Sequence, residues 1–199
     1  MKSEFKVAGI DFGSKLSGFT VIAWIDSDSL VVKWMQSEKK RSADDFLQKT
    51  ISSFGPYIIG IDAPLSLPGI YRWPGEYEDY FYRIADRMAA AMSPMFIGGL
   101  TARAIKLAHQ LRQAGIQVEE VYPKLLAAEW KLSRSGYRKN DGNIALALEM
   151  IKKQTGWVLP DTKATWHHVD ALLALASAVR IQNGTAATMG DEKEGMIYY

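Results

Sequence analysis

The chain contains no cysteine, and this absence removes several kinds of chemistry at once. Without thiols there is no disulfide, no thiolate nucleophile and no zinc ion held by cysteine. A reducing compartment suits such a chain, so we expect the protein to be cytoplasmic. No apolar run approaches the ~18 residues of a membrane span, and residues 1–6 are charged, unlike the start of a signal peptide. We therefore expect no membrane partner.

An excess of charge of one sign is also missing. The 24 basic and 22 acidic residues leave a net charge of +2, far from the basic excess of a nucleic-acid coat protein. A local basic groove remains compatible with this balance. The length of 199 residues and the hydrophobic content of 48% suit one sizeable domain. We expect that domain over residues 1–184, followed by a weakly patterned C-terminal tail over 185–199.

The periodicity of apolar residues predicts an order of elements that is typical of one fold. Strands are expected over residues 5–11, 17–25, 30–35, 58–62 and 116–122, and helices over residues 42–54, 79–92, 100–114, 124–132, 143–155 and 167–182. Short, turn-rich connections make the first three strands antiparallel neighbours. This order predicts an α/β fold of ribonuclease H topology, with a five-stranded mixed sheet of three antiparallel and two parallel strands flanked by helices.

Two near-copies of one phrase each place an aspartate at the end of a buried strand. Gly9-Ile10-Asp11 closes the first strand, and Gly60-Ile61-Asp62 closes the fourth. The carboxyl ends of parallel strands form the ligand-binding edge of an open α/β sheet. In the predicted topology these two strands are adjacent and parallel, so both carboxylates are expected to face one site.

Two further acids extend this pattern. Glu120 lies near the end of the fifth strand, where alternation sends Glu119 and Glu120 to opposite faces, so that only one of them points at the site. Asp170 lies near the start of the last helix, in what we expect to be its first turn. The aspartates also have simpler explanations. Asp11 and Asp62 are each compatible with capping a turn through the backbone, and Asp170 with a favourable interaction at a helix N-terminus.

Four clustered carboxylates would raise one another's pKa unless cations neutralise them. Hard oxygen ligands of this kind hold Mg²⁺ or Mn²⁺. Two such ions can hydrolyse a phosphodiester without a covalent nucleophile, since one activates water and the other stabilises the leaving oxygen. We therefore expect Asp11, Asp62, Glu120 and Asp170 to be catalytic metal ligands for two ions.

Five phrases in a fixed order suggest a family. They are Gly9-Ile10-Asp11, Gly60-Ile61-Asp62-Ala63-Pro64-Leu65, Arg83-x-x-Asp86, Glu120-Val121-Tyr122-Pro123 and Asp170-Ala171-Leu172. Up to about Arg180 the chain resembles a family of predicted ribonuclease-H-like nucleases, catalogued as domain of unknown function 429. The resemblance implies the ribonuclease H fold and an acidic site made of the four acids. In the wider superfamily a second acid often stands three residues before the last aspartate, where this chain has His167.

Several polar residues are candidates for contacting a substrate. Arg83 and Asp86 have the spacing of an ordinary helix-surface ion pair, whereas the resemblance favours a role at the mouth of the site. His167, with its neighbour His168, is either structural or a proton donor to a leaving group.

A basic segment is the candidate for tracking a phosphate backbone. Arg138 and Lys139, with further basic and aromatic residues at Lys131, Arg134, Trp130 and Tyr137, either contact a nucleic acid or form a solvated loop. Aromatic residues also crowd the 63–82 region, as satellite core, a stacking platform or a dimer surface: Tyr71, Trp73, Tyr77, Tyr80, Phe81 and Tyr82.

Three functions are compatible with these patterns. The leading one is a metal-dependent nuclease or phosphodiesterase that hydrolyses nucleic acid. The second is a ribonuclease H-like module without catalysis that binds or scaffolds. The third is an actin-like ATP-dependent phosphotransferase, suggested by Asp11-x-Gly13 but disfavoured because such proteins need two lobes. The oligomeric state is left open, with a homodimer among the options.

Overall fold

A five-stranded mixed sheet forms the centre of the protein, which is described by a computed structural model over residues 6–26, 29–132 and 136–199. The strands are β1 (Lys6–Asp11), β2 (Val21–Asp26), β3 (Lys33–Gln36), β4 (Ile58–Asp62) and β5 (Gln117–Glu120). Their order is β3-β2-β1-β4-β5. β1 and β3 run antiparallel to β2, and β4 runs parallel to β1 and β5. The predicted ribonuclease H-like fold class is confirmed.

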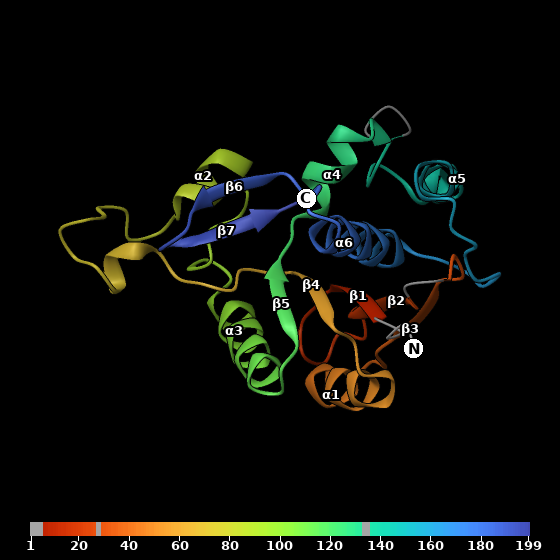
Figure 1. The fold of residues 1–199 in the computed structure, drawn as a ribbon, viewed down its shortest axis with the longest axis horizontal. Coiled ribbons are helices and arrows are strands. Elements are labelled where there is room, and N and C mark those ends of the chain that lie inside the picture. The colour runs from red at the N-terminus through yellow and green to blue at the C-terminus, as the bar shows by residue number, and fades with distance from the viewer. Residues whose placement is uncertain (1–5, 27–28, 133–135) are drawn as a thin grey trace.

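Helices cover both faces of this sheet (Figure 1). One face carries α1 (Ala43–Phe54) and α3 (Gly98–Gln113), and the other carries α6 (Trp166–Gln182) with α4 (Pro123–Glu129) and α5 (Ile144–Thr155) outside it. Two buried apolar cores follow from this layering, because alternate residues of each strand point to opposite faces. In β1, Val7 belongs to the α6 core, whereas Ala8 and Ile10 belong to the other.

Two glycines allow α6 to lie directly against the sheet. A Cβ atom on Gly9 would stand 1.9 Å from the backbone nitrogen of Leu175, and a Cβ on Gly60 would stand 2.8 Å from the carbonyl oxygen of Ala174. Gly9 and Gly60 are paired across β1 and β4. The repeated glycine of the Gly-Ile-Asp phrase is therefore a packing requirement of α6.

The helix predicted over residues 79–92 is much shorter than expected, and that prediction was wrong in extent. α2 spans only Ile84–Ala89. The carboxylate of Asp79 accepts hydrogen bonds from the backbone N–H groups of Phe81 and Tyr82, which fixes a turn in place of a helical start. Ala90, with φ of 47°, then ends the helix in the left-handed region.

The other elements agree in type with the prediction and differ in their ends. Strand β2 begins four residues later than expected, since Gly18 (φ 77°) and a Ser14–Ser17 turn precede it. Two short 3₁₀ helices, η1 (Gly69–Tyr71) and η3 (Asp141–Asn143), lie in the connections. Within the described ranges, no helix combines the length and apolarity needed to cross a membrane.

The C-terminal segment forms a β-hairpin, although its sequence predicted no regular element. β6 (Thr188–Asp191) pairs antiparallel with β7 (Gly195–Tyr198), and the pair lies beside α2 (Figure 1). Glu194 is buried and accepts hydrogen bonds from the backbone N–H groups of Gly69 and Ile84, each at 2.6 Å. The hairpin thereby fastens the 63–83 connection and the start of α2 to the domain. The division of the chain at residue 184 stays a prediction.

Candidate acidic site

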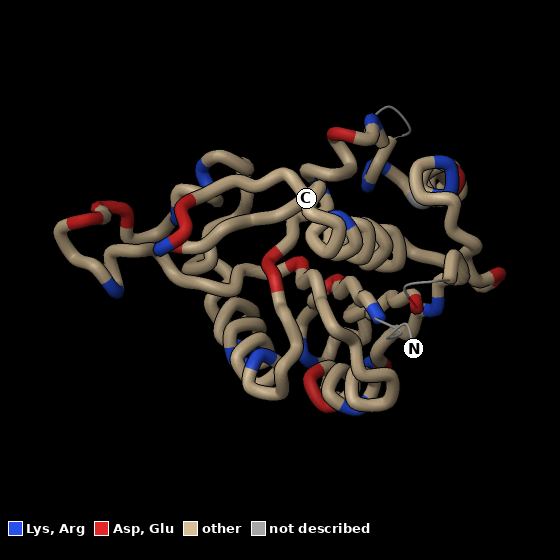
Figure 2. Tube along the Cα trace, viewed as in Figure 1, with Lys and Arg blue, Asp and Glu red and all other residues tan. Residues whose placement is uncertain are grey.

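Asp11 and Asp62 lie side by side at the carboxyl ends of β1 and β4. They are directly paired in the parallel register, and alternation places both on the face that carries α6. Asp11 is buried, whereas Asp62 is partly exposed. Acidic positions at the strand ends gather in the middle of the molecule (Figure 2). A cavity of about 210 Å³ opens beside the two aspartates, with apolar wall residues that include Met92, Ile97 and Leu100.

Asp170 approaches this pair from α6. The helix begins at Trp166, so Asp170 is its fifth residue and not in the first turn as expected. Favourable interaction with the helix N-terminus therefore explains its position less well. Asp170 is 1% exposed. Burial is the main cause that raises its pKa from 3.8 to about 7, against the opposing effect of Arg138.

The pKa of Asp62 shows that the three acids form one electrostatic unit. Burial raises this pKa well above its usual value, and the charges of Asp11 and then Asp170 raise it further. Arg138 acts in the opposite direction, and Glu120 contributes the smallest of these effects. Clustered carboxylates that act on one another in this way form a site that a cation would stabilise.

His167 contacts the site directly. Its Nδ1 lies 2.6 Å from Oδ2 of Asp11, and its ring stacks on Phe19 with centroids 4.9 Å apart. Its side chain is 30% exposed. The neighbouring His168 is buried, and its Nδ1 accepts a hydrogen bond from the backbone of Thr165 at the start of α6. The structure thus separates the histidines into one at the site and one that caps a helix.

Glu120 belongs to a different cluster. It is paired with Ile61 in the register of β4 and β5, and it therefore lies on the sheet face opposite to that of Asp62. Its carboxylate accepts two hydrogen bonds from Arg83, each at 2.6 Å, and one from the backbone N–H of Leu65 at 2.7 Å. Glu120 nevertheless lines the same cavity as Asp11 and Asp62. Its role as a metal ligand stays a prediction.

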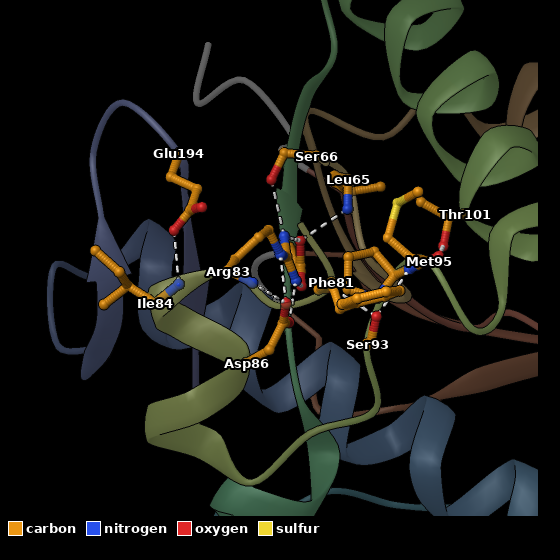
Figure 3. Close-up of polar contacts among 12 residues, drawn as sticks. Leu65, Ser66, Phe81, Arg83, Ile84, Asp86, Ser93, Met95, Thr101 and Glu194 are labelled. Atoms are coloured by element: carbon orange, nitrogen blue, oxygen red, sulfur yellow. Dashed lines mark hydrogen bonds and ion pairs between the residues drawn. The ribbon is translucent and has the colours of Figure 1, made fainter. Parts of the chain in front are cut away.

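Arg83 is the centre of this second cluster and is fully buried (Figure 3). Its guanidinium donates to Asp86 through Nε and Nη2, to Glu120 through Nη1 and Nη2, and to Ser66 through Nη1. These five contacts match the five N–H donors of an arginine. Arg83 and Asp86 therefore hold each other and Glu120, and a substrate-binding role for either stays a prediction.

The basic segment is only partly described. Arg134 lies outside the described residues, Lys131 and Lys139 are exposed, and Trp130 packs against the α6 core. Arg138 reaches Asp170, with Nη2 2.6 Å from Oδ2. This contact is an ion pair without hydrogen-bond geometry. Of the candidate phosphate-binding residues, Arg138 is therefore the one that the structure places in the acidic site.

The aromatic residues of the 63–82 region separate into two groups. Tyr77 is partly buried and donates a hydrogen bond to Asp191 of the C-terminal hairpin. Tyr71, Tyr80 and Phe81 are each about half exposed. The ring of Phe81 lies 5.7 Å from that of Phe96, which is also exposed. A platform or dimer role for the exposed group stays a prediction.

Two tyrosines lie at the site, and the sequence had not assigned either of them a contact with the acids. The hydroxyl of Tyr137 donates a hydrogen bond to Oδ1 of Asp170. Tyr122 lines the cavity, and burial raises the pKa of its phenol, helped by the charge of Asp62. Tyr122 follows Glu120-Val121 in a phrase that the resemblance already contained, so this position had a signal. Tyr137 had none beyond its place in a basic segment.

The side chains as arranged do not yet form a metal cage. Across residues 6–26, 29–132 and 136–199, no three acidic or histidine side chains converge closely enough to hold an ion. The donor set itself fits Mg²⁺ or Mn²⁺, because Asp11, Asp62 and Asp170 supply hard carboxylate oxygens that repel one another. At present Asp11 is bound by His167 and Asp170 by Tyr137 and Arg138.

Fold and site define a class: a ribonuclease H-like α/β domain with three acids meeting at the ends of its central strands and its last helix. Among solved structures, the chain is similar to one described as "Thermus thermophilus RuvC structure", with 17% sequence identity and a TM-score of 0.44. That similarity covers 94% of this chain and 99% of the other. No family model and no curated protein matches the chain.

Proposed function

We propose that the protein is a metal-dependent nuclease or phosphodiesterase that acts on nucleic acid. The observation that carries this proposal is the meeting of Asp11, Asp62 and Asp170 in a partly open site, where burial and then the charges of the other two acids raise the pKa of Asp62. Acids kept close at such an electrostatic cost are typical of functional sites. Their place at the carboxyl ends of adjacent parallel strands is where ligands bind in α/β sheets.

In this proposal the three aspartates hold Mg²⁺ or Mn²⁺. Bound divalent ions would activate water and stabilise the leaving oxygen of a phosphodiester. Glu120 joins the ligands only if it gives up the hydrogen bonds that Arg83 donates to it. We therefore assign to Arg83 and Asp86 the task of fixing Glu120 and the end of β5 beside the cavity.

His167 is the proposed proton donor. One ring nitrogen is held by Asp11, which orients the imidazole, and the partial exposure of the side chain leaves the ring accessible to a substrate. An oriented imidazole near a phosphodiester can protonate the leaving oxygen. Lys139 and Arg138 are the proposed contacts to phosphate groups near the site.

A cleavage assay with matched variants tests the proposal. Structured and single-stranded DNA and RNA are incubated with Mg²⁺ or Mn²⁺ and either the native chain or the variant Asp62→Asn. Asp45→Asn makes the same change at an exposed position of α1 and serves as the control. We expect cleavage by the native chain and the control, and loss of cleavage by Asp62→Asn. Equal cleavage by Asp62→Asn would overturn the site.

The non-catalytic alternative has one observation in its favour. His167, Tyr137 and Arg138 supply protein partners for two of the three acids. If the native chain binds these nucleic acids with the same affinity in Mg²⁺ and in chelator, and cleaves none of them, the binding module replaces the nuclease as the better description.

A further inference from the structure

Both oxygens of the Asp170 carboxylate are covered by two consecutive residues of one turn. Tyr137 donates its hydroxyl hydrogen to Oδ1, and the guanidinium of Arg138 lies 2.6 Å from Oδ2. Asp170 itself is 1% exposed, whereas the side chain of Arg138 is 49% exposed. The guanidinium is thus much more exposed to solvent than the carboxylate with which it pairs.

The turn that presents Arg138 has an unusual backbone. Arg138 has a φ of 56°, in the left-handed region that residues with a side chain rarely adopt. Gly136 precedes it with a φ of 77°, and Asn143 donates a side-chain hydrogen bond to the carbonyl oxygen of Gly136 at 3.2 Å. The ring of Tyr137 packs edge-on against Trp166 at 5.5 Å. These contacts fix the two residues that directly precede Arg138.

The charges around Arg138 explain why the turn is held there. Asp11, Asp62 and Asp170 all act on its guanidinium, and Arg138 opposes the rise in the pKa of both Asp62 and Asp170. His167 acts on Asp170 in the same direction as Arg138, with a smaller effect. A divalent ion at the same carboxylates would supply the same neutralisation.

We propose that Arg138 is a built-in counter-ion that competes with a divalent cation for Asp170. This inference rests on the proposed function, because it takes Asp170 as a metal ligand. An ion reaches Oδ2 of Asp170 only after the guanidinium withdraws, and the exposure of Arg138 gives its side chain room to do so. The withdrawn guanidinium is then free to pair with a phosphate group. Metal and phosphate ligands therefore support each other's binding, since coupling between sites is reciprocal.

Calorimetric titration with Mn²⁺ tests the competition without any activity assay. In Arg138→Gln the competitor is gone, and we expect Mn²⁺ to bind about tenfold more tightly, within the range usual for coupled ligands. Arg138→Lys keeps the charge and is expected to bind Mn²⁺ much as the native chain does. Lys139→Gln, a loss of the same charge at the exposed next residue, controls for a general electrostatic effect. Circular dichroism verifies that each variant is folded.

A second measurement follows Arg138 itself. In the folded native chain, the Nε–H resonance of Arg138 is assigned by its loss in Arg138→Gln or Arg138→Lys, and Mg²⁺ is then added to saturation. We expect this resonance to shift as the guanidinium leaves Asp170. A resonance that stays in place at saturation overturns the proposal, as does Mn²⁺ affinity that is unchanged or weaker in a folded Arg138→Gln. Equal tightening in Lys139→Gln overturns it as well.

Asp170→Asn separates this inference from the function beneath it. If Asp170→Asn binds Mn²⁺ as tightly as the native chain, Asp170 is not a ligand and the proposed ligand set fails. If Asp170→Asn weakens binding while Arg138→Gln leaves it unchanged, the ligand set stands and the competition alone is refuted.

Discussion

Two acidic clusters lie at neighbouring strand ends of this protein, and they have opposite characters. In the first, Glu120 and Asp86 share Arg83, a buried cation with all five donors engaged. In the second, Asp11, Asp62 and Asp170 have the half-exposed Arg138 as a neighbouring cation, and Asp11 also contacts His167. The first cluster is closed and satisfied, and the second is open and under-neutralised.

The difference teaches that an acid at a strand end is not by itself a ligand. Asp62 and Glu120 occupy similar positions on adjacent parallel strands, but the register places them on opposite faces of the sheet. Asp62 lies on the face that carries α6 and Asp170, whereas Glu120 lies on the opposite face and contacts Arg83. The degree to which the charges are neutralised, more than position along a strand, distinguishes the two clusters.

The largest effect is expected from breaking the closed cluster. Arg83→Ala leaves Asp86 and Glu120 buried without their cation, which should lower the free energy of unfolding by about 3–5 kcal/mol. Denaturant titration measures this change. Arg41→Ala, which breaks an exposed pair with Glu38, should cost no more than about 1 kcal/mol. Similar losses in both variants would contradict the distinction between the clusters.

The open cluster should give the reverse result. Asp62→Asn should reduce metal-dependent cleavage at least about a hundredfold, since even residues that only support metal ligands contribute ten- to hundredfold. The same change should keep or raise stability at neutral pH, because it removes a carboxylate whose pKa is raised by burial. Asp86→Asn is the matched partner, and we expect it to lower stability. If Asp62→Asn lowered the free energy of unfolding as much as Asp86→Asn does, the proposed difference between the two clusters would be refuted.

The stability of the metal-free protein should depend on pH through the open cluster. The pKa of Asp170 rises from 3.8 to about 7 on folding, so the folded state holds its proton more tightly. The stability that this group contributes is complete below about pH 4 and is lost as the pH rises from there through 7, on the order of 4 kcal/mol in all. Thermal unfolding in chelator between pH 4 and 8 measures the trend. Asp170→Asn should flatten it, and an unchanged slope would refute the assignment.

The smallest expected effect concerns the hairpin that encloses the closed cluster. Glu194→Ala removes the acceptor for the N–H groups of Gly69 and Ile84, and leaving such groups unsatisfied costs about 1–3 kcal/mol. Hydrogen exchange should show faster exchange at these two amides. Exposed Glu192→Ala in the same hairpin is the control. Loss of protection in both variants would mean that the contact of Glu194 is not what fastens the hairpin.

Much of the fold could be predicted from the sequence because its signals are local. Buried apolar runs, short turns and helical periodicity led to the sheet order, and the Gly-Ile-Asp phrases led to the pairing of Asp11 with Asp62. The short α2 could not be predicted in this way, because its start depends on Asp79 and Asp86 accepting backbone hydrogen bonds. None of these hydrogen bonds is reflected in the spacing of apolar residues in the sequence.

The site was predictable only in part for a similar reason. Asp170 and His167 were identified, but the partners Tyr137 and Arg138 come from a polar turn whose path depends on two left-handed residues. From the sequence, alternation along β5 shows only that Glu119 and Glu120 point to opposite faces of the sheet. The register between β4 and β5 is needed to decide that Glu120 lies on the face opposite to Asp62. The C-terminal hairpin also depends on the buried Glu194, which the spacing of apolar residues does not predict.

The close approach of α6 to Gly9 and Gly60 ties the dimensions of the core to those of the site. Asp11 and Asp62 are carried by the sheet, whereas Asp170 is carried by α6, so the thickness of this one interface sets the gap that a substrate meets. A single methyl group at either glycine would meet the backbone of α6 within 3 Å and wedge the layers apart. All three carboxylates would survive such a change, but the separation of Asp170 from the other two would increase. Gly9 and Gly60 therefore set the distance between α6 and the two aspartates that follow them in the sequence.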